Sequence, residues 1–264
     1  MALEHAAAGA MRSALAISGA YTDLMLPEPP ADRPFVYLNM VSSVDGKATV
    51  DGSERGLGSA DDKRMMQELR SHADAVMNGA TTLRVSGSSP LVRDEALLER
   101  RKRLGLAPQP VGVIVSRRGD LPLDAPFFRS GKFEGAVVVT DLSTEAQRAA
   151  IRATGRTVIE VPDGAENGGA IVRAVARELG VRRLLCEGGP TINRSLLGAG
   201  VVDELFLTFA PWLVAGTENL TIVEGEAFSR ETMVRLRFLQ ALHDEATDEL
   251  YLRYAVARNE PVSG

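Results

Sequence analysis

Residues that can bind an anion stand at the ends of several short apolar runs of this chain. The run 183–186 ends at Glu187, two glycines follow, and apolar residues recur at helical spacing from Pro190 onward. A strand that turns through glycines into a helix aims free backbone N–H groups at an anion, because no Cβ blocks the approach and the helix N-terminus carries about half a positive charge. The pattern suits a cofactor diphosphate, although glycine also marks ordinary turns.

A second turn of this kind follows the apolar run 74–78. Gly79 ends the run, and the hydroxyl residues Thr81 and Thr82 come soon after it. Backbone N–H groups and hydroxyls can together hold a phosphate or a nicotinamide. Further along, a polar loop ends in Arg93, whose guanidinium suits a two-pronged contact with a substrate phosphate. A solvated surface arginine is the alternative.

Charged residues also follow two other expected strands. After the run 35–41 come Asp45 and Lys47, and ligands of open α/β sheets bind near the carboxyl ends of strands. These two side chains could polarise a substrate or relay a proton; alternatively they belong to a turn, since Asp-Gly is a common turn dipeptide. Arg117 follows the run 111–115 and suits the 2′-phosphate that distinguishes NADP from NAD.

The composition is that of an ordinary globular protein. Of 264 residues, 45% are hydrophobic and 25% charged, enough for one large α/β domain or two small ones. The 35 acidic residues exceed the 30 basic ones, and this balance argues against nucleic acid or an anionic membrane as the main partner. No apolar run reaches the roughly 20 residues of a membrane span. Residues 6–20 lack the basic start of a signal peptide and suit an amphipathic helix or a loose end.

The single cysteine and the three histidines show no metal-binding spacing. Cys186 cannot form an internal disulfide, so a reducing cytoplasm fits the chain. Its place at the end of an apolar run favours a small buried residue over a nucleophile. His5, His72 and His243 are too scattered to predict a shared metal.

Hydrophobic periodicity predicts an α/β fold. The expected strands are 35–41, 74–78, 111–115, 136–140, 158–161, 183–186, 205–210, 234–242 and 249–256. The expected helices are 60–72, 146–153, 171–179 and 192–199, with a solvated, charged helix and loop at 94–108. A glycine-rich flap at 51–58 and an unstructured loop at 85–93 separate them. Strands that alternate with helices imply a mainly parallel sheet flanked by helices, and the last two strands imply an antiparallel C-terminal hairpin.

Taken together, these segments resemble one known family, the reductase domain of riboflavin biosynthesis. That domain forms the C-terminal part of a bifunctional deaminase–reductase or stands alone. The motifs that carry the resemblance, in the right order and spacing, are S-S-V-D-G-K, R-S-H-A-D-A-V-M-N-G-A-T-T, P-L-V-R, E-G-G-P-T and G-V-V-D-E-L. The resemblance implies a reductase domain over residues 34–257, an N-terminal extension over 1–33 and a tail over 258–264.

The resemblance implies a dihydrofolate-reductase-like fold, NADPH as the cofactor, a cytoplasmic homodimer and a phosphorylated pyrimidine as the substrate. The family reduces the ribosyl group of 5-amino-6-(5-phosphoribosylamino)uracil to a ribityl group. A hydride then passes from the nicotinamide to C1′ of the ribose, so the work of the enzyme is positioning and electrostatics.

The resemblance also assigns roles to single residues. The positions that match NADPH contacts are Met40, Gly79, Thr81, Thr82, Arg117, Gly188, Gly189, Pro190, Thr191, Ile192 and Asn193. The positions that match substrate contacts are Glu54, Arg70, Leu91, Arg93 and Glu187. The candidate catalytic residues are Asp45, Lys47 and Glu187. A carboxylate at 187 suits the N–H groups of a pyrimidine, and the two arginines suit phosphate or carbonyl oxygens.

Three departures from the family pattern lie on the substrate side. Ser88-Ser89-Pro90 stand where relatives usually carry Asp-Asp-Pro, Gly56 replaces a common aromatic or basic residue, and Glu54 replaces a common hydroxyl. They bear on the identity of the heterocycle more than on the type of reaction. The zinc signature of the deaminase is lacking, so only the reductase activity is expected.

Two other functions are compatible with the sequence. A reductase of a related heterocycle, such as dihydrofolate or a pterin, would share the fold. A non-catalytic NADPH-binding module would keep the glycine turn and lose the substrate side. Arg70, Arg93 and Glu187 are all present, which favours an enzyme.

Overall fold

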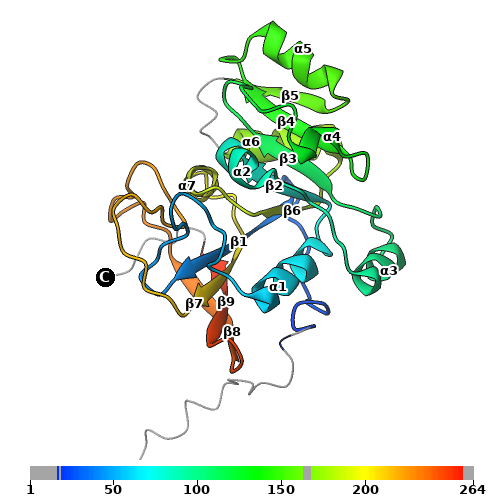
Figure 1. Cartoon of the computed structure of the whole chain (residues 1–264). Helices are drawn as coiled ribbons and strands as arrows, with labels where there is room; N and C mark the ends of the chain where they lie inside the picture. Colours follow the sequence, from blue (N-terminus) through cyan, green and yellow to red (C-terminus); the bar gives the residue numbers. More distant parts are fainter. Residues whose placement is uncertain (1–16, 18, 163–167, 258–264) are drawn as a thin grey trace, which may run out of the picture.

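The computed structural model describes residue 17, residues 19–162 and residues 168–257, and within them a nine-stranded sheet forms the centre (Figure 1). The strands lie side by side in the order β5-β4-β3-β2-β6-β1-β7-β9-β8. Neighbours from β5 to β7 are parallel, and β9 is antiparallel to both β7 and β8. Their bounds are β1 Phe35–Ser43, β2 Ala75–Gly79, β3 Val111–Val115, β4 Gly135–Thr140, β5 Thr157–Val161, β6 Arg183–Cys186, β7 Glu204–Ala210, β8 Leu236–Asp244 and β9 Glu249–Val256.

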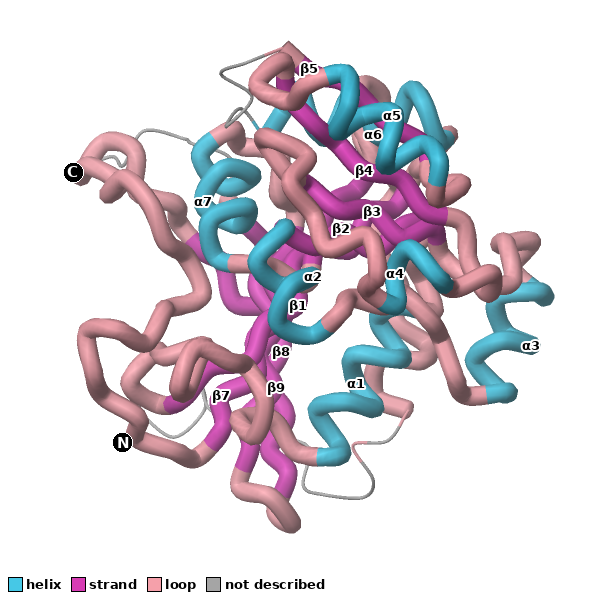
Figure 2. Tube along the Cα trace, turned by 45° about the horizontal axis from the view of Figure 1, so that its top comes forward, coloured by secondary structure: helices cyan, strands magenta, loops and turns pink. Residues whose placement is uncertain are grey.

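Helices cover both faces of this sheet (Figure 2). Val36 and Leu38 of β1 pack with α6 and α7 on one face, whereas Tyr37 packs with Leu69 of α1 on the other. This alternation follows from the opposite directions of successive side chains in a strand. Helices α2, α4 and α5 cover β3 and β4 on the face of α1. The helix bounds are α1 Ala60–Arg70, α2 Ala80–Ser86, α3 Glu95–Arg103, α4 Pro126–Arg129, α5 Glu145–Ala153, α6 Gly168–Leu179 and α7 Pro190–Gly198.

The α/β class, the mainly parallel sheet and the antiparallel hairpin are confirmed, and strand ends shift from their predicted positions by at most two residues. The sequence does not predict α2 or α4. Helix α2 contains three β-branched residues in seven, which are poor helix formers, and lies between Gly79 and Gly87, whose φ is 80°. Helix α4 is a four-residue helix that begins at Pro126.

The charged run of α3 is not simply solvated as predicted. Arg101 is fully buried, and its guanidinium donates to the carbonyls of Ala73 at 2.7 Å and Arg70 at 3.1 Å. These carbonyls lie at and just beyond the C-terminal end of α1, where backbone acceptors lack helical partners. Arg101 therefore ties α3 to α1.

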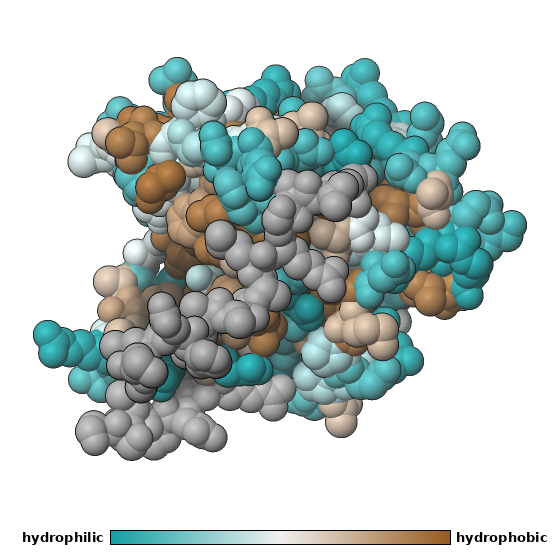
Figure 3. Space-filling model, turned by 90° about the horizontal axis from the view of Figure 1, so that it is seen from below, coloured by the Kyte–Doolittle hydropathy of each residue, from teal (hydrophilic) through white to brown (hydrophobic). Residues whose placement is uncertain are grey.

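The described part of the N-terminal extension packs on α1. Tyr21 is buried, and the N–H groups of Gly19 and Tyr21 donate to the Glu68 carboxylate at 2.6 and 2.8 Å. Most of the predicted helix in 6–20, and the tail 258–264, lie outside the described residues. Among described residues, no helix is long and apolar enough to span a membrane, and no group of three or more His, Cys, Asp and Glu could hold a metal. In Figure 3, hydrophilic side chains lie along the upper and right-hand edges of the visible face.

Candidate active site

A pocket of about 640 Å³ opens beside the carboxyl ends of β1, β2 and β6. Its size is that of a site for a small organic ligand. In this lining we call the two glycine turns and α2 the cofactor wall, and α1, the flap 51–58 and the loop 87–93 the substrate wall. The predicted site residues that line it are Met40, Glu54, Arg70, Thr81, Thr82, Arg93, Glu187, Gly189 and Pro190.

The turn after β6 presents unblocked backbone to this pocket. Gly189 is the N-cap of α7 and has no side-chain cap, and among described residues the N–H groups of Gly189 and Thr191 have no partner. Gly188 has φ 87°, which favours glycine, and a Cβ there would lie 3.1 Å from the Met40 sulfur. A nine-residue helix thus begins at bare amides, and its dipole favours an anion at this position.

The turn after β2 lies against the turn after β6. Gly79 donates its N–H to the Gly188 carbonyl at 2.8 Å, and a Cβ on Gly79 would lie 3.3 Å from the Gly189 nitrogen. Added bulk at Gly189 would in turn meet Thr82 Oγ1 at 3.3 Å. The structure therefore brings the two predicted glycine turns together, and their amides and hydroxyls fit a dinucleotide diphosphate.

Arg70 and Glu187 form a two-pronged ion pair in the floor of the pocket. Nε of Arg70 lies 2.6 Å from one carboxylate oxygen and Nη2 lies 2.7 Å from the other, with only 10% and 9% of the two side chains exposed. Nη1 of Arg70 also donates to the Leu91 carbonyl at 3.1 Å. The pair fixes the Glu187 carboxylate in one orientation. The guanidinium of Arg70 is thus held by Glu187. Leu91 contributes its backbone carbonyl to this arrangement and does not line the pocket.

Arg93, unlike Arg70, forms no ion pair among the described residues. Its backbone N–H donates to Gln67 Oε1, and its exposed guanidinium makes no hydrogen bond or ion pair among the described residues. It lines the same pocket. An exposed cation in the pocket lining suits a phosphate.

Asp45 and Lys47, which the sequence predicts as catalytic residues at the end of β1, do not line the pocket. The Asp45 carboxylate accepts from Ser43 Oγ at 2.6 Å and from the Ala215 N–H at 2.7 Å. These donors, with the Ser43 hydroxyl first, hold the pKa of Asp45 at about 2. Lys47 Nζ donates to the Asn219 carbonyl at 2.9 Å. Both side chains connect the loop after β7 to the end of β1.

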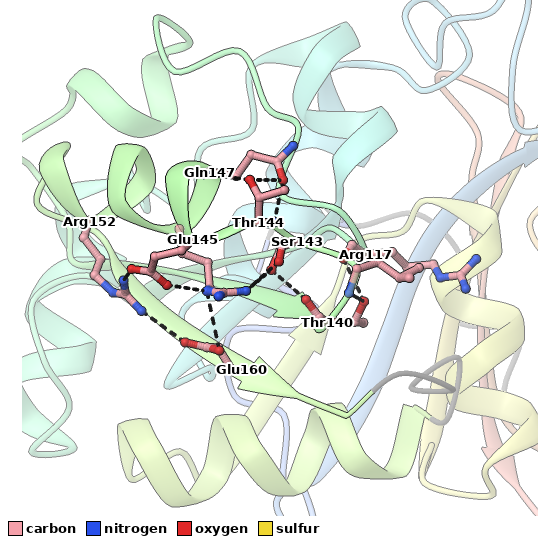
Figure 4. A network of polar contacts seen from close by, with 10 residues as sticks. Arg117, Thr140, Ser143, Thr144, Glu145, Gln147, Arg152 and Glu160 are labelled. Carbon is pink, nitrogen blue, oxygen red and sulfur yellow. Dashed lines mark hydrogen bonds and ion pairs between the residues drawn. The ribbon is translucent and has the colours of Figure 1, made fainter.

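Arg117, Ile192 and Asn193 also lie outside the pocket lining. Thr140 donates to the Arg117 carbonyl, and the side chain of Arg117 points away from the ion pairs of Glu145, Arg152 and Glu160 (Figure 4). Ile192 belongs to the core, and Asn193 is fully buried and donates to the Ile222 carbonyl at 2.9 Å. Their side chains support α7 from behind the turn.

Cys186 is the small buried residue that its position predicts. It is fully buried, and this burial raises the pKa of its thiol to about 12. A thiol with such a pKa is not a nucleophile near neutral pH.

The sequence does not single out Asp62, although it lines the pocket. Burial raises the pKa of its carboxyl group to about 6, with Glu249 and Glu187 adding to the effect and a hydrogen bond from Thr208 opposing it. In the sequence, Asp62 is one of two acids in the first turn of a capped helix, where negative charge is ordinary. No sequence signal separates it from Asp61.

Ser88 and Ser89 are identified from the sequence only as a departure from the family pattern. Both line the pocket, and both hydroxyls are buried without a hydrogen-bond partner among the described residues. Ser88 also has φ 38°, an uncommon conformation for a residue with a side chain. Buried hydroxyls without partners are rare in proteins.

The sheet order and the pocket at its carboxyl edge define the class: an α/β fold with a mainly parallel sheet, whose candidate site faces the ends of central parallel strands. A comparison of sequences agrees, since residues 34–247 match the family model of the RibD C-terminal domain. This chain belongs to the RibD C-terminal domain family.

Two curated relatives span most of the chain. It is 32% identical over 197 residues to the 2,5-diamino-6-ribosylamino-4(3H)-pyrimidinone 5′-phosphate reductase of Methanothermobacter thermautotrophicus, covering 74% of this chain and 85% of that one. It is 28% identical over 203 residues to the enzyme of the same name from Archaeoglobus fulgidus, covering 76% and 91%. A pyrimidine reductase-like protein of Corynebacterium diphtheriae has the same fold, with a TM-score of 0.76 at 22% identity over 86% of this chain and 94% of that one.

Proposed function

We propose that this chain is an NADPH-dependent reductase that converts the ribosyl group of a phosphorylated ribosylaminopyrimidine to a ribityl group. The observation that carries the proposal is the meeting of two glycine turns with the Arg70–Glu187 pair on one pocket. The turns offer bare amides to a diphosphate, and the pair offers an oriented carboxylate to a heterocycle. Membership in the family and the names of the relatives support the same reaction.

Two rings are candidates for the substrate. Both relatives described above are named for the 2,5-diamino-pyrimidinone, so we propose this ring first. The uracil ring predicted from the sequence is the second candidate. A dihydrofolate or a pterin is the competing reductase substrate, and an NADPH-binding module without turnover is the competing non-enzymatic function.

The residues of this chain have distinct tasks in the proposed reaction. The amides of Gly189 and Thr191 bind the diphosphate, Thr82 orients the cofactor, and Arg117 is the proposed contact for the 2′-phosphate. NADPH, when bound, supplies the hydride. Glu187, held by Arg70, accepts N–H groups of the ring, and Arg93 attracts the phosphate.

A single assay separates these functions. NADPH absorbance is followed with the diaminopyrimidinone, the uracil derivative and dihydrofolate in turn. We expect oxidation with a ribosylaminopyrimidine phosphate and none with dihydrofolate. Turnover with dihydrofolate alone, or NADPH binding without any turnover, would overturn the proposal.

We also propose a cytoplasmic homodimer. The C-terminal hairpin exposes the apolar side chains Leu236, Phe238 and Leu250, and the loop after β7 exposes Trp212 and Leu213. Exposed apolar surface of this kind is common where subunits meet. Light scattering on the purified protein measures the mass of the particle, and a monomer at micromolar concentration would contradict the dimer.

A further inference from the structure

Two adjacent acids of α1 face different surroundings. Asp61 is paired with Arg64 at 2.9 Å and keeps 30% of its side chain exposed, whereas Asp62 lines the pocket. Ser59 Oγ caps the helix by accepting from both backbone N–H groups, so neither carboxylate is needed as the cap. Asp62 therefore lines the pocket without serving as the helix cap.

The chain leaves space for the Asp62 carboxyl group. A Cβ on Gly58 would overlap Asp62 Oδ2, and Gly58 lines the same pocket. Thr208 of β7 hydrogen-bonds to the carboxyl group from beneath. The group is thus held between a strand and a bare glycine with access to the cavity.

The charged and titratable groups around Asp62 are mostly acids. Glu187 faces it from the turn after β6, Glu249 from β9 and Lys63 from α1 itself. The charge of Asp62 also raises the pKa of Tyr251 of β9 and of Tyr21 of the N-terminal segment. The nearby pair with Arg70 compensates Glu187, whereas no cation pairs with Glu249 among the described residues. These surroundings and partial burial favour the protonated form of Asp62.

We propose that Asp62 is the proton donor of the reduction and delivers its carboxyl proton to the nitrogen bonded to C1′ of the substrate. The proposal rests on the proposed function. A hydride on C1′ of an open-chain imine forms the new C–H bond, and the electron pair of the C=N bond moves to the nitrogen. The O–H bond of Asp62 breaks as the new N–H bond forms. The carboxylate then regains a proton from water through the open pocket.

The test compares Asp62→Asn with Asp61→Asn, the same change one residue away and outside the pocket. The assay measures kcat from pH 5 to 9 and the Kd for NADPH. A donor must be protonated, so the parent rate falls as pH rises above the pKa of Asp62, about 6. We expect Asp62→Asn to lower kcat about 100-fold, to remove this fall and to leave the NADPH Kd within about twofold. Asp61→Asn keeps the parent profile.

Folding of the variant is not expected to fail. The pKa of Asp62 is raised in the folded state, so its ionisation weakens the fold as pH rises from about 4 to above 6. Asparagine removes that cost. Gly58→Ala provides a second test, because the added methyl displaces the carboxyl group, and we expect a similar loss of kcat without loss of NADPH binding.

The outcomes are distinguishable. If the parent oxidises NADPH with neither ribosylaminopyrimidine, the proposed function fails and this proposal falls with it. If the parent is active and Asp62→Asn keeps both its kcat and the fall above pH 6, only the role of Asp62 is refuted. A loss of kcat that leaves the pH profile unchanged assigns Asp62 a structural role and also refutes the proposal.

Discussion

The two walls of the pocket are made from different parts of the chain. On the proposed cofactor side, the turns at Gly79 and Gly189 present backbone groups at the ends of β2 and β6. On the substrate side, side chains of α1 and of two loops line the cavity. The sheet itself places backbone at strand ends, whereas the direction of a side chain depends on tertiary packing. The first wall can therefore be predicted from the sequence, whereas the second depends on the folded structure.

Loss of Glu187 is expected to have the largest effect, because it disables the substrate wall. Glu187→Gln removes the charge that a buried Arg70 requires, so we expect kcat/KM for the pyrimidine to fall about 100-fold and stability to fall by about 3 kcal/mol. NADPH affinity stays near that of the parent. Steady-state kinetics, calorimetry and urea unfolding measure the three quantities. Unchanged kcat/KM would show that this wall does not hold the substrate.

Bulk at Gly189 is expected to disable the cofactor wall instead. Gly189→Val forces methyl groups toward Thr82 Oγ1, and about 2 kcal/mol of crowding corresponds to NADPH binding weakened about 30-fold. The kcat at saturating NADPH changes little. Gly131→Ala, where nothing lies within 4 Å of the new methyl, is the control and keeps the parent Kd. Equal NADPH affinity in all three proteins would place the cofactor elsewhere.

Replacing Ser88 tests whether its unpaired hydroxyl on the substrate wall destabilises the ligand-free protein. Ser88→Ala removes a buried hydroxyl without a partner, so we expect the free energy of unfolding of the ligand-free protein to rise by about 1 kcal/mol and the KM for the pyrimidine to increase. Ser71→Ala is the matched control, because that hydroxyl donates to the Glu68 carbonyl and its loss lowers stability. Destabilisation by Ser88→Ala would mean that its hydroxyl already has a partner in solution.

Asp45 is expected to have the smallest effect on catalysis, since it lies on neither wall. Asp45→Asn should leave turnover at pH 7 unchanged. The folded-state pKa of about 2 is below the ordinary value of 3.8, so Asp45 stabilises the fold above about pH 4 and loses this contribution as pH falls toward 2. Acid unfolding curves of parent and variant should therefore differ above pH 4 and converge near pH 2. A large loss of turnover would support the catalytic role predicted from the sequence.

Sequence patterns predict the features of this fold that depend on the backbone. Short apolar runs predict the nine strands, and the turn 187–190 follows from glycines between a strand and a helix. They do not predict α2, whose Thr81 and Thr82 favour strands over helices. They also do not predict that Arg101 is buried, because its partners are the backbone carbonyls of Arg70 and Ala73, which are distant in the chain.

Sequence patterns also do not distinguish the roles of residues that are neighbours in the sequence. Asp61 and Asp62 are both aspartates and follow one another in the first turn of α1. Only Asp62 lines the pocket. Asp45 and Lys47 stand at a strand end as a catalytic pair would, but the loop after β7 takes their hydrogen bonds. That loop is distant in the chain, so only the folded structure reveals the contact.

The most direct test is a crystal structure of the protein with NADPH. We expect the diphosphate oxygens within hydrogen-bond distance of the Gly189 and Thr191 amides, at the start of α7, with the nicotinamide extending toward Glu187. A diphosphate bound at any other place, with the turn at Gly189 closed against its neighbours, would contradict the account.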